Sequence, residues 1–204
     1  RLRILACQID IPPMTTGAER DRHLAATAAL VRAALRETPA DLVVLPELAS
    51  IDYSRASFDR LDALAEPLDG ASYQVWSALA RDCGVHVLYG FARTDGGRNF
   101  ISVAAVDPQG TRLGHYDKLH LAQYGASMEK DYFSRGDHLF LFTVKGFRLA
   151  PIICYDIRIP ELSRSLAVGH GVDVLLHCGA YFRDVSFDTW HEFIVTRALE
   201  NQCY

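Results

Sequence analysis

Residues 150–161 read APIICYDIRIPE, and the character of the sequence changes within this stretch. Ala150 to Ile153 are apolar and predict a buried strand, while Pro160 marks a helix start, because proline is favoured in the first turn of a helix. A strand that leads into a helix is typical of α/β proteins. Cys154 lies at the junction. This thiol is either a small packed residue or a nucleophile presented at the mouth of a site.

The rest of the chain alternates helices and strands towards both ends, with hairpins in the middle. We predict strands at 2–10, 41–45, 85–91, 100–106, 111–116, 139–144, 147–153 and 172–177, and helices at 17–37, 71–83, 160–168 and 189–201. Residues 117–138 are polar and irregular, so we predict a long loop there. The pattern indicates an α/β fold, with one mixed sheet or with two sheets covered by helices.

Composition excludes several classes of protein. The chain has 204 residues, a net charge of -4 and a pI of about 6.1, which suit a single domain over 1–204 and disfavour a nucleic-acid partner. No apolar run is long enough for a membrane span. The five cysteines are odd in number and form no CxxC, which predicts free thiols in a reducing, cytoplasmic location. GxGxxG, GxxxxGK[ST] and HExxH are absent, so we expect no nucleotide, metal or other cofactor.

Three stretches deliver a reactive side chain where a predicted strand ends. They are LVVLPELAS with Glu47, GHYDKLHLAQ with Lys118, and LAPIICYDIRIPE with Cys154. Sites in α/β proteins are built at the carboxyl ends of strands. A carboxylate can remove the thiol proton as general base, and an ammonium can hold a developing oxyanion. Each residue also has a plainer interpretation as surface acid, solvated lysine or packed thiol, and spacing alone does not bring the three together.

Taken together, the three stretches closely resemble the nitrilase superfamily of carbon–nitrogen hydrolases, from ILACQ near the start to RALENQCY at the end. The resemblance implies an αββα sandwich of two mixed sheets flanked by helices. It also implies a catalytic triad of Glu47, Lys118 and Cys154. A fourth acid, in SMEKDYFSRGD, falls on Glu129, with Asp131 as the weaker candidate. Glu129 is expected to position the lysine or the substrate.

The resemblance further implies a mechanism and a pocket. Glu47 takes the thiol proton, Cys154 attacks an amide carbonyl, and Lys118 with the backbone N–H of Tyr155 holds the oxyanion. Tyr155 thus counts among the substrate-binding residues, and the other pocket residues expected from family position are Tyr53, Phe133, Ala180 and Tyr181.

The motif CYDIRIPE is similar to the CYDxRFPE motif of the amidase-like branches of the superfamily, so we predict an amidase that acts on a small or medium carboxamide. N-carbamoyl amide hydrolase, nitrilase and acyl transferase remain alternatives with the same triad. A catalytically silent binding module is disfavoured because all three reactive residue types are present. A thiol redox protein is disfavoured because the chain has no CxxC that would supply a resolving cysteine.

Three smaller expectations complete the interpretation. Chains of this family usually continue beyond the ALENQCY helix through further strands, which are missing from these residues, and the family also implies a homo-oligomer.

Asp156 and Arg158 are expected to form an ion pair that orders the turn after the nucleophile. The remaining thiols are expected to be packing residues, of which Cys178 lies nearest the pocket: Cys7, Cys83, Cys178 and Cys203.

Overall fold

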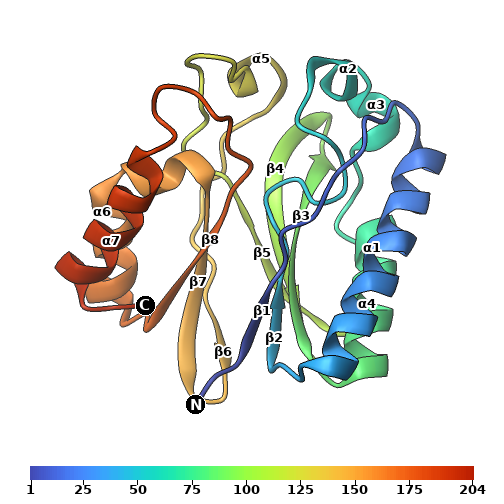
Figure 1. Ribbon diagram of the computed structural model, residues 1–204. Helices are drawn as coiled ribbons and strands as arrows, with labels where there is room; N and C mark the ends of the chain where they lie inside the picture. The colour runs from blue at the N-terminus through green and yellow to red at the C-terminus, as the bar shows by residue number, and fades with distance from the viewer.

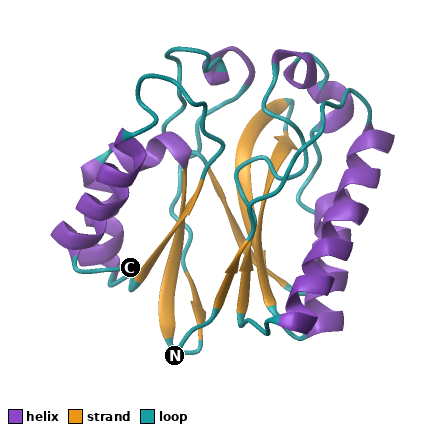
Figure 2. Ribbon diagram, viewed as in Figure 1, coloured by secondary structure: helices purple, strands orange, loops and turns teal.

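The computed structural model describes residues 1–204 and contains two β-sheets that pack face to face, with helices on both outer sides (Figures 1 and 2). The first sheet has five strands in sequence order: β1 (Ile4–Ala6), β2 (Leu42–Val44), β3 (His86–Asp95), β4 (Arg98–Val106) and β5 (Arg112–Asp117). Strands β1 to β3 are parallel, and β3 to β5 form an antiparallel meander. This sheet is therefore mixed.

The second sheet has three strands: β6 (Phe142–Val144), β7 (Phe147–Ile153) and β8 (Val174–Cys178). Strand β7 pairs antiparallel with β6 and parallel with β8, so this sheet is mixed as well. The β6–β7 turn is formed by Lys145 and Gly146, which both have positive φ, as a tight hairpin turn requires. The αββα arrangement expected from the sequence is thus confirmed.

The helices cover the outer faces of the two sheets. Helices α1 (Gly17–Glu37) and α4 (Ala71–Cys83) lie on the first sheet, and α6 (Pro160–Arg164) and α7 (Thr189–Asn201) lie on the second (Figure 1). The remaining helical segments are short: α2 (Arg55–Phe58), α3 (Leu61–Leu64), α5 (Glu129–Tyr132), η1 (Cys154–Arg158) and η2 (Ser165–Gly169). None of these helices combines the length and apolarity needed to cross a bilayer.

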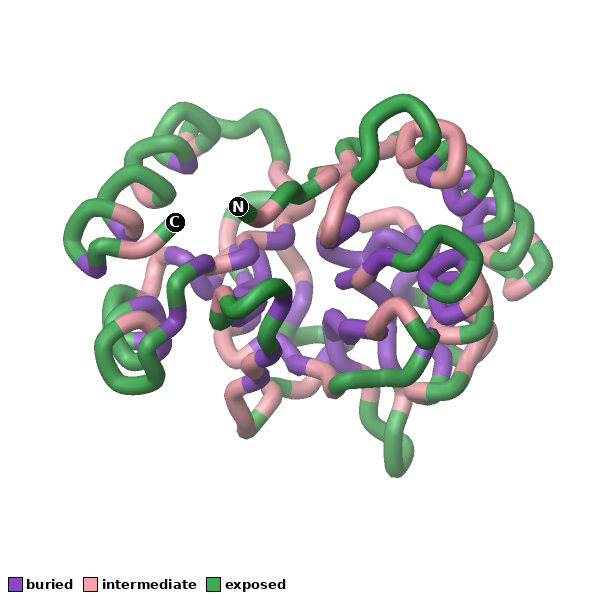
Figure 3. Tube along the Cα trace, turned by 90° about the horizontal axis from the view of Figure 1, so that it is seen from below, coloured by how far each residue is buried: buried purple, intermediate pink, exposed green.

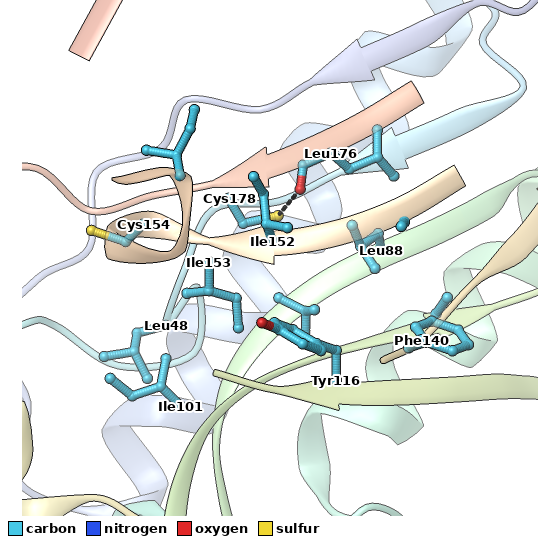
Figure 4. Close-up of a cluster of buried hydrophobic side chains, with 14 of the residues drawn as sticks. Leu48, Leu88, Ile101, Tyr116, Phe140, Ile152, Ile153, Cys154, Leu176 and Cys178 are labelled. Atoms are coloured by element: carbon cyan, nitrogen blue, oxygen red, sulfur yellow. Dashed lines mark hydrogen bonds between the residues drawn. The ribbon is translucent and has the colours of Figure 1, made fainter. Parts of the chain in front are cut away.

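Two apolar clusters hold the layers together. The larger one fills the space between the sheets and includes Leu88 and Ile101 from the first sheet with Ile152 and Leu176 from the second (Figure 4). The smaller one lies between the first sheet and helices α1 and α4 and includes Trp76. Buried residues accordingly lie between the layers, while the exposed ones lie on the loops and on the outward sides of the helices (Figure 3). Burial of apolar surface is the main force that stabilises such a sandwich.

The structure corrects four of the predicted elements. The strand at 2–10 is paired only over Ile4–Ala6, and the helix predicted over 160–168 changes to a π-helical turn after Arg164. The strand predicted over 139–144 begins only at Phe142, and the loop predicted over 117–138 contains the short helix α5. Short elements of this kind are stabilised by tertiary contacts, which local periodicity does not reveal.

Candidate active site

Lys118, directly after β5, is the centre of a buried ionic cluster. Its side chain has no exposure to solvent, and its Nζ lies 2.7 Å from Oε1 of Glu47 and 2.7 Å from Oε1 of Glu129. Both carboxylates are also buried. Charged groups are almost never fully buried unless they are paired, and here one ammonium bridges two carboxylates.

Glu47 lies in the loop after β2, and this loop runs across β3. The second carboxylate oxygen of Glu47 accepts a hydrogen bond from the backbone N–H of Ala180 at 3.0 Å. A Cβ on Gly90 of β3 would lie 2.2 Å from the carbonyl oxygen of Pro46, so only glycine permits this close approach. The Ala180 N–H thus holds the Glu47 carboxylate, while close packing on β3 holds the backbone that carries it.

Glu129, at the start of α5, has hydrogen bonds on both oxygens. Its Oε2 accepts from the backbone N–H of Ala122 at 2.8 Å, and its Oε1 accepts from the Tyr53 hydroxyl at 2.8 Å in addition to Lys118. The alternative acid, Asp131, is exposed and contacts Gln123 instead. Of the two candidates, the structure therefore places only Glu129 at the lysine.

Cys154 begins the turn η1, where β7 ends. Its φ is 46°, a left-handed conformation that is unfavourable for a residue with a side chain. The carbonyl oxygen of Cys154 lies 3.0 Å from Nε2 of His177. In Figure 4 its sulfur points away from the apolar cluster between the sheets. The turn thus holds the Cys154 side chain at the edge of the core, with its sulfur directed away from the apolar cluster.

Burial and the neighbouring charges shift the pKa values of Glu47, Lys118 and Cys154. Burial raises the pKa of Glu47 to about 7, with the Lys118 cation acting in the opposite direction and Glu129 adding to the rise. Burial lowers the pKa of Lys118, but the attraction of Glu47, Cys154 and Glu129 outweighs it, so the net shift is well upward. Burial and the neighbouring Glu47 raise the pKa of the Cys154 thiol. The raised pKa favours the protonated thiol form of Cys154.

A pocket opens next to Cys154. Predicted site residues Tyr53, Ala180 and Tyr181 all line it. Phe133 does not, because it is buried in the core, where its ring packs edge-on against Phe58 with the centroids 5.0 Å apart. Tyr155 follows Cys154, and its ring lies beside that of Tyr124 rather than on the pocket wall. The lining residues that sequence reasoning did not select are Ala122, Tyr124, Ser127, Phe182, Asp184, Ser186 and Trp190.

The expected ion pair between Asp156 and Arg158 is absent. Asp156 accepts hydrogen bonds from Tyr116, His120 and the backbone N–H of Ile153. Arg158 turns the other way. Its guanidinium lies over four aromatic rings, with centroid distances from 4.7 to 5.7 Å: those of Trp190, Tyr124, Phe193 and Tyr155. Residues two apart in a tight turn point in different directions, which the sequence pattern could not show.

The other thiols lie outside the ionic cluster. All five cysteines are free, and Cys178 is buried in the apolar core, where its Sγ lies 4.0 Å from the carbonyl oxygen of Leu176 (Figure 4). Cys83 is exposed on α4. No group of three or more His, Cys, Asp or Glu side chains has an arrangement suited to a metal ion.

Comparison with known proteins identifies the class: the chain belongs to the carbon-nitrogen hydrolase family, which residues 3–204 match, and the resemblance to the nitrilase superfamily is confirmed. It is 37% identical over 178 residues to a hydrolase encoded in the pqqF 5' region of Pseudomonas protegens, covering 86% of this chain and 60% of that protein. It is 34% identical to the 2-oxoglutaramate amidase of Bacillus subtilis, covering 81% of this chain and 61% of that one. The chain thus spans about three fifths of the length of these relatives.

Solved structures share the fold. The amidase from Nesterenkonia sp. superposes with a TM-score of 0.79 at 23% identity, covering 99% of this chain and 73% of that one. Nit3 of Saccharomyces cerevisiae, a member of branch 10 of the nitrilase superfamily, superposes with a TM-score of 0.83 at 23% identity over the same shares. At this level of identity the likeness establishes the shared architecture.

Proposed function

We propose that the protein hydrolyses the C–N bond of a small or medium carboxamide through a thioester on Cys154. The observation that carries this proposal is the buried Glu47–Lys118–Glu129 cluster beside a thiol in a strained turn. Glu47, Lys118 and Cys154 are buried ionisable groups with shifted pKa values, and Cys154 also lines a pocket, which is a combination typical of an active site. The family and the amidase relatives support the same chemistry.

In the first half-reaction, Glu47 takes the proton of the thiol while the sulfur attacks the amide carbon. The carbonyl oxygen becomes an oxyanion, which the Lys118 ammonium and the backbone N–H of Tyr155 stabilise. The C–N bond then breaks, Glu47 returns its proton to the nitrogen, and ammonia or an amine leaves. A pKa of Glu47 near 7 suits both the base and the acid step.

In the second half-reaction, water attacks the thioester carbon and gives its proton to Glu47. The S–C bond breaks, the carboxylic acid product leaves, and the thiolate of Cys154 recovers a proton from Glu47. Glu47 accepts and returns every proton that is transferred in the two half-reactions. Lys118 stays charged throughout, because its raised pKa favours the ammonium form. Glu129 holds Lys118 and takes no part in bond making.

The substrate is further proposed to carry a carboxylate at a distance from its amide. Nε and Nη2 of Arg158 are buried and have no hydrogen-bond partner. The guanidinium lies 4.7 Å from the ring of Trp190, which lines the same pocket as Cys154. A substrate carboxylate would supply the partner that this guanidinium lacks. The relatives include proteins named 2-oxoglutaramate amidase and omega-amidase, which supports this class of amide.

The test is ammonia release by the full-length protein from matched carboxamides, ω-carboxy amides, N-carbamoyl amides and nitriles. Cys154→Ala is expected to remove all release, whereas Cys83→Ala, which changes an exposed thiol on α4, serves as the matched control and is expected to leave it unchanged. Release that is faster from ω-carboxy amides than from their neutral analogues supports the full proposal. Turnover of nitriles alone, or none by a folded protein, overturns it.

A further inference from the structure

The buried carboxylate of Asp156 receives hydrogen bonds from both segments that carry the proposed catalytic residues. Its side chain has no solvent exposure. Oδ2 accepts from the Tyr116 hydroxyl at 2.8 Å and from the backbone N–H of Ile153 at 3.0 Å. Oδ1 accepts from the backbone N–H of His120 at 3.0 Å and lies 2.9 Å from Nδ1 of the same residue. Such a fully satisfied buried carboxylate is rigid.

The donors lie at particular places in the chain. Tyr116 and His120 flank Lys118 on either side by two residues, and Ile153 directly precedes Cys154. Tyr116 belongs to β5 of the first sheet, whereas Ile153 ends β7 of the second. Asp156 therefore links the lysine-bearing segment of one sheet to the nucleophile-bearing turn of the other, at the point where the two must meet.

The turn needs such a link. Cys154 has a φ of 46°, which no residue with a side chain prefers, so the conformation persists only if its surroundings impose it. The Ile153 N–H bond to Asp156 fixes the backbone just before Cys154, and the His177 bond to the Cys154 carbonyl fixes it just after. Burial lowers the pKa of His177 to about 4, so the ring is neutral near pH 7 and can donate from Nε2.

We propose that Asp156 is a positioning residue that sets the distance between the Lys118 ammonium and the Cys154 thiol, acting through Tyr116 and the Ile153 backbone. It touches no reacting atom. The inference rests on the proposed hydrolase function, because the positioned groups are the oxyanion-binding cation and the nucleophile of that reaction. Small displacements of catalytic groups have large effects on rate, with a 1 Å error costing up to about a hundredfold.

The decisive variant is Tyr116→Phe, which removes one hydroxyl from the Asp156 carboxylate and keeps a fully buried ring in place. We expect kcat to fall about tenfold or more with KM nearly unchanged, since the pocket walls are formed by other side chains. Tyr89→Phe is the matched control. Tyr89 is also a fully buried tyrosine, but its hydroxyl has no partner in the structure. Its removal is expected to leave kcat unchanged.

A second readout does not depend on turnover. Alkylation of the full-length protein by iodoacetamide is followed by mass spectrometry at Cys154, with exposed Cys83 as the internal reference. The ratio of the Cys154 rate to the Cys83 rate is expected to fall in Tyr116→Phe and in Asp156→Asn, and to stay constant in Tyr89→Phe. A wild-type protein that alkylates in this way but releases no ammonia would contradict the proposed function, while the ratios still decide the role of Asp156.

A merely structural role gives a different pattern. In that case Tyr116→Phe lowers the unfolding temperature but leaves kcat and the alkylation ratio at wild-type values below that temperature, and the inference is overturned. If Asp156→Asn does not fold, Tyr116→Phe alone decides between the two outcomes.

Discussion

Lys118 is a fully buried cation whose only charged contacts are two fully buried carboxylates. A charge in such a place is stable only while its partners are present, because desolvation of an unpaired charge is unfavourable by several kcal/mol. Burial of these three charged groups is therefore unfavourable for stability unless all three are present. The reaction that we propose for Cys154 uses the base and the cation of this cluster, which explains why it is buried here.

Replacement of this lysine tests the charge balance. Lys118→Met leaves two uncompensated carboxylates, so we expect the free energy of unfolding to fall by about 3–5 kcal/mol and hydrolysis to cease. Urea unfolding of the full-length protein measures the first effect. Lys130→Met, a change at an exposed lysine next to Glu129, is the control and should alter stability by less than about 0.5 kcal/mol. Equal stability of the two variants would contradict the buried ionic cluster.

The raised pKa of Glu47 predicts a pH dependence. Glu47 can act as base only when ionised, so kcat/KM is expected to rise with pH through about 7. The same raised pKa makes the free energy of unfolding fall with rising pH, whereas the rate is expected to rise. Because the folded-state pKa is above the ordinary value of 4.5, Glu47 stabilises the fold at low pH, and this contribution is lost as the pH rises through about 7. A rate profile that is flat across this range would count against Glu47 as the base.

At the scale of elements, the turn η1 stores local strain at the proposed nucleophile, Cys154. Cys154→Ala and Cys154→Gly both remove the thiol, but only glycine adopts a φ of 46° without penalty. We expect the glycine variant to be more stable than the alanine variant by about 1 kcal/mol, as measured by thermal unfolding. At most exposed helix positions the order is reversed. An alanine variant of equal or greater stability would show that the turn is relaxed.

Sequence reasoning located whole elements best where apolar periodicity is joined by a local signal for at least one end. The predicted bounds 17–37 and 71–83 agree with α1 and α4. Helix α1 begins with a capping box formed by Thr16 and Glu19, and α4 ends at Gly84 in a left-handed conformation. The short helices α2 and α3 lack apolar periodicity and were not predicted. Their positions depend on packing that only the folded chain reveals.

The same reasoning located the site in part. Glu47, Lys118 and Cys154 were selected because each lies where a predicted strand ends and together they match the family's triad, and Glu129 was selected by family position. The structure brings Glu47 and Glu129 to Lys118, but their catalytic roles stay predictions. Phe133 was placed wrongly, since an aromatic residue in a loop can face the core as well as a pocket. Asp156 was given the wrong partner, because its contacts with Tyr116 and His120 cross between the sheets.

For the molecule as a whole, we propose that the outer face of the second sheet's helices is the contact surface of the homo-oligomer that the family resemblance implies. Helix α7 exposes three apolar side chains, Ile194, Val195 and Leu199, and Val168 on η2 is also exposed. Apolar surface of this kind is a candidate for contact between copies. We expect Leu199→Glu to shift the full-length protein towards the monomer in light-scattering measurements. Leu30→Glu, at an exposed leucine on α1, is the control, and an equal effect of both changes would argue against this face.

The central claim is that Cys154 carries the acyl group of an amide during turnover, and one measurement tests it most directly. The full-length protein is mixed with an ω-carboxy amide, quenched in acid during turnover, and analysed by mass spectrometry for an acyl group on each of its cysteines. We predict a mass increase equal to the acyl group, on Cys154 alone, that disappears when the substrate is exhausted. Ammonia release without any adduct on Cys154, or with an adduct on another thiol, would contradict the account.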